Sequence, residues 1–283
     1  MGEKGFDRKK FDRLAQEIRY ITTDMICRYG QGHLGGSLGL AEIVITLYYR
    51  IMNIRPADPE WEERDRLVLS KGHCGPILYT TLAYKGFFPR SWLGTLNVDG
   101  TRLPSHVDQN RTPGIDMTAG SLGQGLSCAC GIALAGKMNK KDYRTFCIIG
   151  DGESNEGQIW EAALFVSHNR LDNLLVMCDY NKLQIDGFTE DVLSLEPLTE
   201  KWRSFGWEVF EMDGHDWDDV YTKIREAMAV KGRPSMIIAH TIKCRGNRLL
   251  ENKPECHYVR VPDKATYRKI MDGLVHKDVQ LPY

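Results

Sequence analysis

The chain contains 283 residues, 42% of them hydrophobic and 27% charged, which is enough for one large domain or two small ones with a sizeable core. Its 37 Lys and Arg residues nearly balance its 38 Asp and Glu residues, so neither a nucleic acid nor a charged membrane surface is an expected partner. No apolar run approaches the roughly 20 residues that a membrane-spanning helix needs.

The first half of the chain predicts helices separated by glycine-rich and proline-containing segments. Leu14, Ile18, Ile21 and Met25 recur at helical spacing and predict a helix over residues 8–29. The glycine-rich sequence GQGHLGGSLG then interrupts this pattern. The other predicted elements are helices over 40–51, 75–85 and 121–138, a strand over 66–70 and an irregular segment over 87–120.

The second half of the chain alternates strand and helix patterns. The predicted strands cover 145–150, 174–179, 208–212 and 235–241, and the predicted helices cover 156–169, 198–205 and 216–230. This alternation predicts the α/β class, with a parallel sheet covered by helices on both faces. We therefore expect a single domain over residues 1–283, with the residues after about 243 forming a C-terminal tail.

The eight cysteines are scattered along the chain. The closest pair, Cys128 and Cys130, has one residue between its members, whereas a zinc clip has two or more. Cys147 and Cys178 lie in apolar, strand-like runs, where cysteine usually behaves as a small buried hydrophobic residue. This usage predicts a reducing, cytoplasmic location rather than a disulfide-linked scaffold.

Polar residues follow the predicted strands, at the edge where parallel sheets bind their ligands. They are Asp151, Asp179, Asn181, Asp213 and His240.

Asp151 is the most informative of these residues because a glycine stands on each side of it. The glycines allow a sharp turn out of the strand and a close approach of an anion to the backbone. The helix that follows, near Glu156, points its free N–H groups toward the same place. A carboxylate beside a phosphate site needs a cation between them, and Mg²⁺ is commonly shared between protein oxygens and substrate phosphates.

Asn181 supports this interpretation through its spacing. Twenty-eight residues separate Gly152 from Asn181, which is enough for one helix and one strand, so Asp151 and Asn181 are expected at the ends of neighbouring strands. A lone Gly-Asp-Gly is usually a turn, and an Asn after a strand is usually a turn or cap residue. The combined pattern is more specific and resembles the thiamin diphosphate motif.

From about residue 10 to 260 the chain resembles the N-terminal portion of transketolases. The segments that carry the resemblance are QGHLGGSLGLAEI (31–43), RDRLVLSKGHCGPILY (64–79), TAGSLGQGLSCACGIALA (118–135), GDGESNEGQIWEAA (150–163), DYNKLQIDG (179–187), AHTIKCRGN (239–247) and ENKPECHY (251–258).

The resemblance implies roles for particular residues. The implied Mg²⁺ ligands are Asp151, the Asn181 side chain and the Leu183 carbonyl. The implied contacts with thiamin diphosphate are His73, Gly120, Ser121, Leu122, Gly152, Glu156 and Asn181, with Glu156 also matching a carboxylate at a subunit interface. The implied catalytic residues around the substrate are His33, His73, His106 and His257. Imidazoles suit proton transfer to and from sugar hydroxyls, because their ordinary pKa lies near the working pH.

The resemblance implies a ketol transfer, in which a two-carbon unit passes from a ketose phosphate to an aldose acceptor. A full transketolase is more than twice as long, and its second domain supplies the pyrimidine pocket and the Glu that activates the cofactor. We therefore expect an obligate C-terminal partner subunit, with two copies of each chain in the assembly. The small-residue helix over 121–138 and Glu156 are candidates to face that partner, although this helix could equally pack within its own domain.

Several residues near the histidines depart from the family pattern, among them Leu34 where Pro is usual and Cys74 where a small residue is common. Ser105 and Val107 flank His106 where the family usually has Gly and Pro, and Tyr258 follows His257 where Gly is usual. These departures leave open a second possibility, a transketolase for an unusual branched or sulfonated sugar in a catabolic pathway.

Other classes of function fit the sequence less well. The α subunit of a 2-oxo acid dehydrogenase lacks the Gly-His pairs found here at 32–33 and 72–73, and deoxyxylulose-phosphate synthase is normally one long chain. A non-catalytic cofactor-binding subunit would have no need of the acidic, amide and His residues. A nucleotide-binding Rossmann module needs Gly-x-Gly-x-x-Gly after a strand, and GSLGQG at 120–125 has neither that spacing nor that context.

Overall fold

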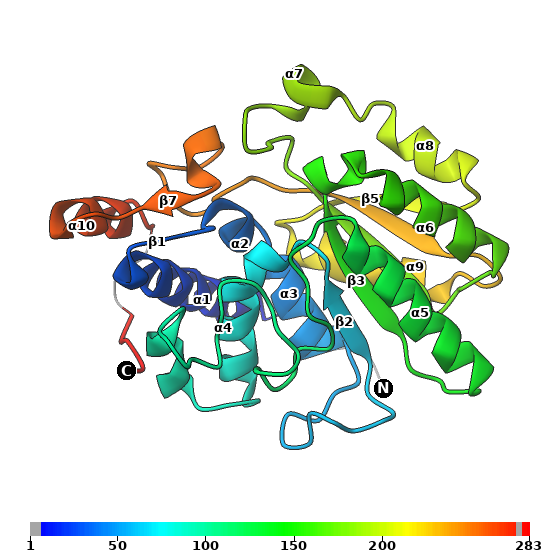
Figure 1. The fold of residues 1–283 in the computed structure, drawn as a ribbon, viewed down its shortest axis with the longest axis horizontal. Helices are drawn as coiled ribbons and strands as arrows, with labels where there is room; N and C mark the ends of the chain where they lie inside the picture. The colour runs from blue at the N-terminus through cyan, green and yellow to red at the C-terminus, as the bar shows by residue number, and fades with distance from the viewer. Residues whose placement is uncertain (1–6, 276–278) are drawn as a thin grey trace.

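The computed structural model describes residues 7–275 and 279–283, so the extremities of the domain predicted over 1–283 lie partly outside the described residues. Its centre is a five-stranded sheet in the order β2-β3-β4-β6-β5, and every neighbouring pair is parallel (Figure 1). The strands are β2 (Arg66–Leu69), β3 (Thr145–Gly150), β4 (Leu174–Tyr180), β5 (Glu208–Asp213) and β6 (Ser235–His240). The predicted α/β class, with helices on both faces of a parallel sheet, is confirmed.

Successive residues of each strand supply two separate cores, because side chains along a strand alternate between the two faces. In β3, Phe146 and Ile148 join one buried cluster, while Cys147 and Ile149 join the other. The first cluster is covered by α1 (Arg8–Tyr29), α3 (Ala41–Thr46), α4 (Gly75–Lys85) and α9 (Trp217–Ala229). The second is covered by α5 (Gln124–Met138), α6 (Gly157–His168) and α8 (Leu198–Ser204).

Some element boundaries differ from those predicted. The helix expected over 40–51 is α3 followed by a π-type turn, η1 (Leu47–Ile51). The helix expected from residue 121 begins at Gln124, because Gly123 has φ +84° and cannot be part of a right-handed helix. The short helices not predicted are α2 (Gly35–Gly39), α7 (Thr189–Leu193), α10 (Lys264–Asp272) and the 3₁₀ turns η2 (Gly72–Cys74), η3 (Arg90–Thr95), η4 (Gly152–Asn155) and η5 (Pro254–Cys256).

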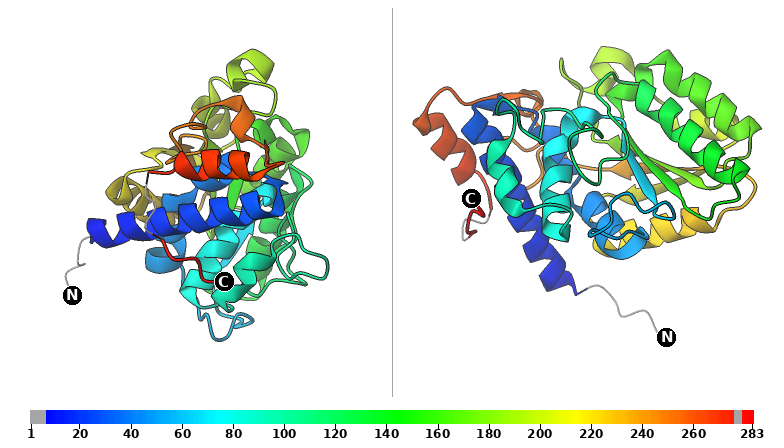
Figure 2. Two further views of the ribbon diagram at one scale, coloured as in Figure 1. Left: turned by 90° about the vertical axis from the view of Figure 1, so that its left-hand side faces the viewer. Right: turned by 60° about the horizontal axis from the view of Figure 1, so that its bottom comes forward.

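The segment after residue 243, which we expected as a tail, packs back onto the start of the chain. β7 (Val259–Arg260) pairs antiparallel with β1 (Gln31–Gly32), and α10 (Lys264–Asp272) contacts α1 (Figure 2). This return path brings Cys256, before β7, against Gly35 in the glycine-rich segment that follows α1. None of the helices within the described residues has the length and apolar character needed to cross a membrane.

Candidate active site

The carboxyl ends of β2, β3, β4 and β6, together with the glycine-rich segment after α1, enclose a cavity of about 360 Å³. It is lined by His33, Gly36, Lys71, His73, His106, Gly120, Leu122, Gly150, Asp151, Gly152, Glu153, Glu156, Asn181, Leu183, Gln184, Ile185, Asp186, Lys243 and His257. All the site residues predicted from the sequence line this cavity except Ser121, which is exposed beside it.

Asp151 stands at the tip of β3 and is 3% exposed. Its Oδ1 accepts a hydrogen bond from the Gly152 N–H at 2.7 Å, and its Oδ2 accepts one from the Lys182 N–H at 2.6 Å. The carboxylate therefore joins the turn after β3 to the segment after β4. Burial and the nearby Asp179 carboxylate raise the pKa of Asp151 to about 6. A cation at this position would favour the charged form.

Asn181 and Leu183 lie beside Asp151 because β3 and β4 are neighbours, with Gly150 opposite Asp179. The Asn181 Oδ1 accepts a hydrogen bond from the Leu183 N–H at 3.1 Å, so the amide oxygen is held at the end of β4. The donor set is thus one carboxylate, one amide and one backbone carbonyl.

This donor set fits a magnesium ion that shares its coordination with phosphate oxygens. Within the part of the chain that the structure describes, no three His, Cys, Asp or Glu side chains are grouped to hold a metal by themselves. An ion here would therefore take further oxygens from a bound ligand. The assignment of Asp151, Asn181 and Leu183 as its ligands stays a prediction.

Two buried lysines, which no sequence motif marked as site residues, line the same cavity. Lys71, just after β2, forms an ion pair with Asp179, and this partner raises the pKa of Lys71 although burial opposes it. Lys243, after β6, donates a hydrogen bond to the Leu183 carbonyl at 2.7 Å, and burial together with Lys71 lowers the pKa of Lys243. Two ammonium groups in a buried cavity suit a polyanionic ligand such as a diphosphate.

The four predicted histidines come from four separate segments and form one cluster. The ring centroid of His33 lies 4.9 Å from that of His73, 5.4 Å from that of His106 and 5.3 Å from that of His257. The sequence alone shows these residues spread over more than 200 positions, so their convergence is a product of the fold.

The histidine cluster is held in its neutral form. Burial is the main cause, and nearby positive charge adds to it. Burial, His106 and Lys243 lower the pKa of His33 to about 4. Burial, Lys243, His33 and Lys71 lower the pKa of His257 to about 3. Burial also lowers the pKa of His73 and of His106. Each neutral imidazole has one nitrogen able to accept a proton or a hydrogen bond from a hydroxyl group.

The backbone around His106 is held by hydrogen bonds that involve Val107. The Val107 N–H donates to the Gly72 carbonyl at 3.4 Å, and the Val107 carbonyl accepts from the Ala119 N–H at 3.1 Å. A proline at position 107 could not make the first of these bonds, because it has no N–H. The backbone at position 72 also passes close to Ala119, and this requires a glycine, since a Cβ on Gly72 would lie 2.3 Å from the Ala119 carbonyl oxygen.

Glu153 is a third buried charged residue of this cavity that the sequence pattern does not reveal. Its buried carboxylate accepts hydrogen bonds from the N–H groups of Gly123 and Gly150, both at 2.9 Å, and from the Ser70 hydroxyl. These donors belong to the start of α5, the end of β3 and the end of β2. Glu153 therefore fixes the relative positions of three segments that border the cavity.

The cavity retains unpaired polar atoms that a cofactor could satisfy. The His33 Nδ1 and the Gln184 Nε2 are buried and lack a hydrogen-bond partner within the described residues. Buried polar atoms normally have partners, so these two point to a polar ligand. Together with the lysines, the oxygen donors and the glycine-lined turn, they fit a thiamin diphosphate with Mg²⁺.

Comparison with known proteins gives a family and close relatives. Residues 11–269 match the family described as "Transketolase, thiamine diphosphate binding domain". The chain is 52% identical over 250 residues to the 6-deoxy-6-sulfo-D-fructose transketolase subunit SqwG of Clostridium sp. (strain MSTE9), covering 88% of this chain and 91% of that protein. It is 40% identical over 255 residues to one subunit of the apulose-4-phosphate transketolase of Phocaeicola vulgatus, covering 90% of each chain.

Solved structures agree with this match. The transketolase from Leishmania mexicana superimposes with a TM-score of 0.85 at 30% identity, over 92% of this chain and 40% of that one. The transketolase from Campylobacter jejuni gives a TM-score of 0.85 at 29% identity, over 92% and 42%. This chain thus corresponds to less than half the length of those transketolases.

Proposed function

The chain belongs to the transketolase family, and on this premise we propose that it is the diphosphate-binding subunit of a two-chain transketolase. In this proposal it transfers a two-carbon ketol unit from a ketose phosphate to an aldose acceptor, with thiamin diphosphate and Mg²⁺ as cofactors. The observation that carries the proposal is the convergence of strand-end oxygen donors, two buried lysines and four neutral histidines in one cavity. Two relatives that match along nearly their whole length are themselves named transketolase subunits.

The strand ends would hold the metal and the diphosphate. Asp151, the Asn181 amide oxygen and the Leu183 carbonyl would provide the metal ligands, and Lys71 and Lys243 would neutralise the phosphate charge. When bound, thiamin diphosphate supplies the nucleophilic carbon and the electron sink that ketol transfer needs. The cavity supports this part of the proposal because its unpaired polar atoms and its charges match such a ligand.

The histidine cluster would handle protons at the sugar hydroxyls. At neutral pH all four rings are uncharged, so each offers one nitrogen that can accept a hydrogen bond from a sugar hydroxyl and orient it for proton transfer. The separation of 4.9–5.4 Å between His33 and the other three rings allows more than one imidazole to face the same hydroxyl-bearing carbon. Burial within the cavity also limits access of bulk water to the reacting atoms.

A separate C-terminal subunit would complete the site by supplying the pyrimidine pocket and the activating Glu. We propose two copies of each chain. The exposed Glu156 and Leu122 at the cavity rim, and the apolar Leu164 and Phe165 on α6, which are 60% and 44% exposed, are candidates to contact that subunit. Large exposed apolar side chains commonly mark protein interfaces. A cytoplasmic location agrees with the eight cysteines, all of which are free thiols.

A second candidate function is a transketolase for an unusual sugar. Two relatives carry names that specify a sulfonated fructose and apulose 4-phosphate. Tyr258 provides a structural reason, because its ring lies 4.8 Å from that of His33 and adds bulk near the catalytic cluster. Branched and sulfonated sugars are therefore the substrates to test first.

The test is a ketol-transfer assay of this chain purified together with a C-terminal transketolase subunit, across ordinary, branched and sulfonated ketose substrates. We expect thiamin diphosphate-dependent transfer by the pair. A pair that forms a stable complex, binds the cofactor and yet transfers no ketol unit from any substrate would instead indicate a non-catalytic subunit. A complex that binds no thiamin diphosphate would overturn the proposal altogether.

A further inference from the structure

A second cavity, of about 410 Å³, lies on the other side of the segment that carries Lys243 into the active site. Lys243 lines the active-site cavity, whereas Arg245 and Gly246 line the second one. The two cavities therefore share residues 242–246 as a common wall, which we call the 242–246 segment. This size is within the range of small-molecule sites.

The inner wall of the second cavity is a fixed polar network. Arg19 of α1 binds Glu42 of α3 through two hydrogen bonds of 2.7 and 2.6 Å, and Glu42 also contacts the His215 Nδ1 at 3.0 Å. The His215 Nε2 accepts a hydrogen bond from the Ile242 N–H at 2.8 Å. Arg19 further donates to the Leu38 carbonyl at 3.1 Å. The network thus connects this wall to both the 242–246 segment and α2, and its charged groups are already paired.

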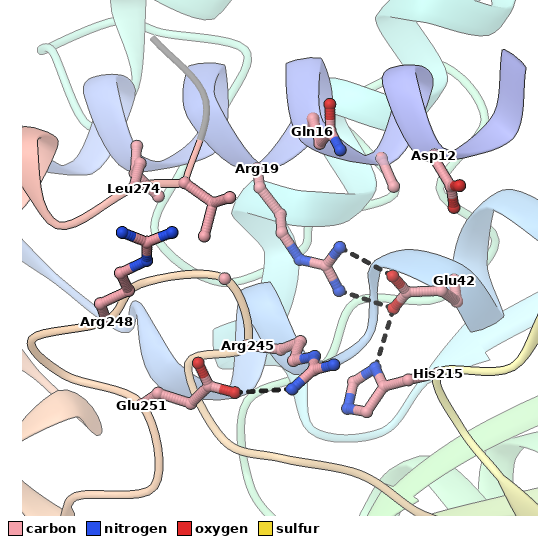
Figure 3. Close-up of a pocket in the computed structure, with 12 residues that line it drawn as sticks. Asp12, Gln16, Arg19, Glu42, His215, Arg245, Arg248, Glu251 and Leu274 are labelled. Atoms are coloured by element: carbon pink, nitrogen blue, oxygen red, sulfur yellow. Dashed lines mark hydrogen bonds and ion pairs between the residues drawn. The ribbon is translucent and has the colours of Figure 1, made fainter. Parts of the chain in front are cut away.

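The two remaining arginines of the cavity have N–H groups that are free to bind a ligand. Arg245 binds Glu251 through one nitrogen at 2.8 Å, which leaves further N–H groups of its guanidinium free for another acceptor. Arg248 is exposed, and its guanidinium has no hydrogen-bond or ion-pair partner within residues 7–275 and 279–283. Figure 3 shows Arg248 at the left of the cavity and Arg245 below its centre, with Glu251 between them.

The opposite side of the cavity offers hydrogen-bond acceptors and an amide. Asp12 accepts a hydrogen bond from the Trp217 indole N–H through its Oδ1 at 2.8 Å, which leaves its Oδ2 available. Gln16 also lines the cavity from the same helix, and Figure 3 shows both residues on α1, away from Arg248. A cavity lined by carboxylate and amide groups on α1 and by guanidinium groups elsewhere suits a ligand with hydroxyls at one end and an anion at the other.

We propose that this cavity binds a small phosphorylated polyol, with its phosphate on Arg245 and Arg248 and its hydroxyls toward Asp12 and Gln16. Guanidinium groups bind phosphate through paired, charge-assisted hydrogen bonds. A ligand carboxylate has only two oxygens to accept such bonds, whereas a phosphate has three. Because Arg245 belongs to the 242–246 segment, occupancy of the cavity restrains the backbone that positions Lys243. The cavity is thereby an effector site that is separated from the active site only by the 242–246 segment.

The test measures the binding of sorbitol 6-phosphate, the probe, to the full chain by isothermal titration calorimetry. We expect Arg245→Gln and Arg248→Gln each to weaken binding by about tenfold, the cost of losing one charge-assisted hydrogen bond. Two control variants should leave the affinity for the probe unchanged. Arg268→Gln changes an exposed arginine on α10 that does not line the cavity, and Lys71→Met changes a residue of the active site. Hydrogen exchange at residues 242–246 should slow when the probe binds the wild-type chain.

Other outcomes would overturn the inference. They are no binding by the wild-type chain, equal binding by Arg248→Gln, loss of binding only in Lys71→Met, and unchanged exchange at 242–246 on binding. If citrate binds as tightly as the probe, the assigned ligand class is wrong. None of these readouts measures ketol transfer, so they are independent of the function proposed above.

Discussion

The Lys243 ammonium lies 2.7 Å from the carbonyl oxygen of Leu183, to which it donates a hydrogen bond. That carbonyl is also a predicted ligand of Mg²⁺. One oxygen cannot serve both cations fully, because two positive charges so close together repel each other. We infer that cofactor binding moves the Lys243 ammonium from Leu183 toward the diphosphate.

Replacing Lys243 by Met should therefore weaken thiamin diphosphate binding by about tenfold or more, the loss expected for one hydrogen bond to a charged group. Calorimetric titration of the two-chain complex with cofactor and Mg²⁺ measures the effect. Lys253→Met, a change at an exposed lysine outside the cavity, is the matched control. Equal affinity in Lys243→Met and wild type would show that Lys243 does not contact the diphosphate.

Replacing Asp151 by Ala should abolish Mg²⁺-dependent cofactor binding while the fold persists. Changes behind a metal ligand already cost about 10–100-fold in affinity, so loss of a ligand itself should exceed that range. Cofactor titrations with and without Mg²⁺ measure the loss, and far-ultraviolet circular dichroism checks the fold. A folded variant with normal cofactor affinity would remove Asp151 from the metal site.

Replacing His106 by Ala should lower kcat by about 10²–10⁴-fold, the range expected for one proton-transfer group, and should leave cofactor affinity within about threefold. His168, which is exposed at the end of α6, provides the control variant His168→Ala. If the His106 change weakens the cofactor and spares turnover at saturation, the residue contacts the cofactor rather than the substrate.

Replacing Tyr258 by Gly should broaden the range of sugars that react. The ring is 39% exposed and packs edge-on against His33, so its removal opens space beside the catalytic cluster. A steric change of this kind alters the kcat/KM ratio between two substrates by about tenfold. Tyr258→Phe keeps the ring and should keep the wild-type ratio. An unchanged ratio in Tyr258→Gly would exclude a role in selectivity.

The neutral histidine cluster predicts a pH dependence of stability. His33 faces His73, His106, His257 and Lys243, and its pKa falls from an ordinary 6.5 to about 4 in the folded chain. Between these values the unfolded chain binds the proton and the folded chain does not, so the free energy of unfolding rises with pH in this window. The contribution is lost as the pH falls from 6.5 toward 4.

The variant His33→Asn should reduce this slope by at most about 1.4 kcal/mol per pH unit, the limit for one proton. Urea unfolding at several pH values between 4 and 7 measures it. His240, which lies at the surface beside Glu211 and away from the cluster, supplies the control His240→Asn. Identical slopes for wild type and His33→Asn would contradict the burial of a neutral His33.

Much of the fold was predictable because hydrophobic period and turn residues act locally. Leu14, Ile18, Ile21 and Met25 predicted α1, and the apolar run before Asp151 predicted β3. The sequence did not predict α10 or the pairing of β7 with β1, because short polar helices and two-residue strands carry little periodic signal. Contacts with α1 and β1, at the other end of the chain, hold these elements in place.

The sequence by itself determined the α/β class, the family and the placing of Asp151 and Asn181 at strand ends, because the spacing between adjacent parallel strands fixes which residues meet at their tips. The tertiary structure alone decided which distant residues share the cavity. It turned Lys71 and Lys243 inward, brought His257 against His33, and joined three segments through Glu153. Isolated Lys, His and Glu residues look alike in a sequence whether they face water or a cavity. Their burial, and hence their charge state, follows from long-range packing that no local pattern encodes.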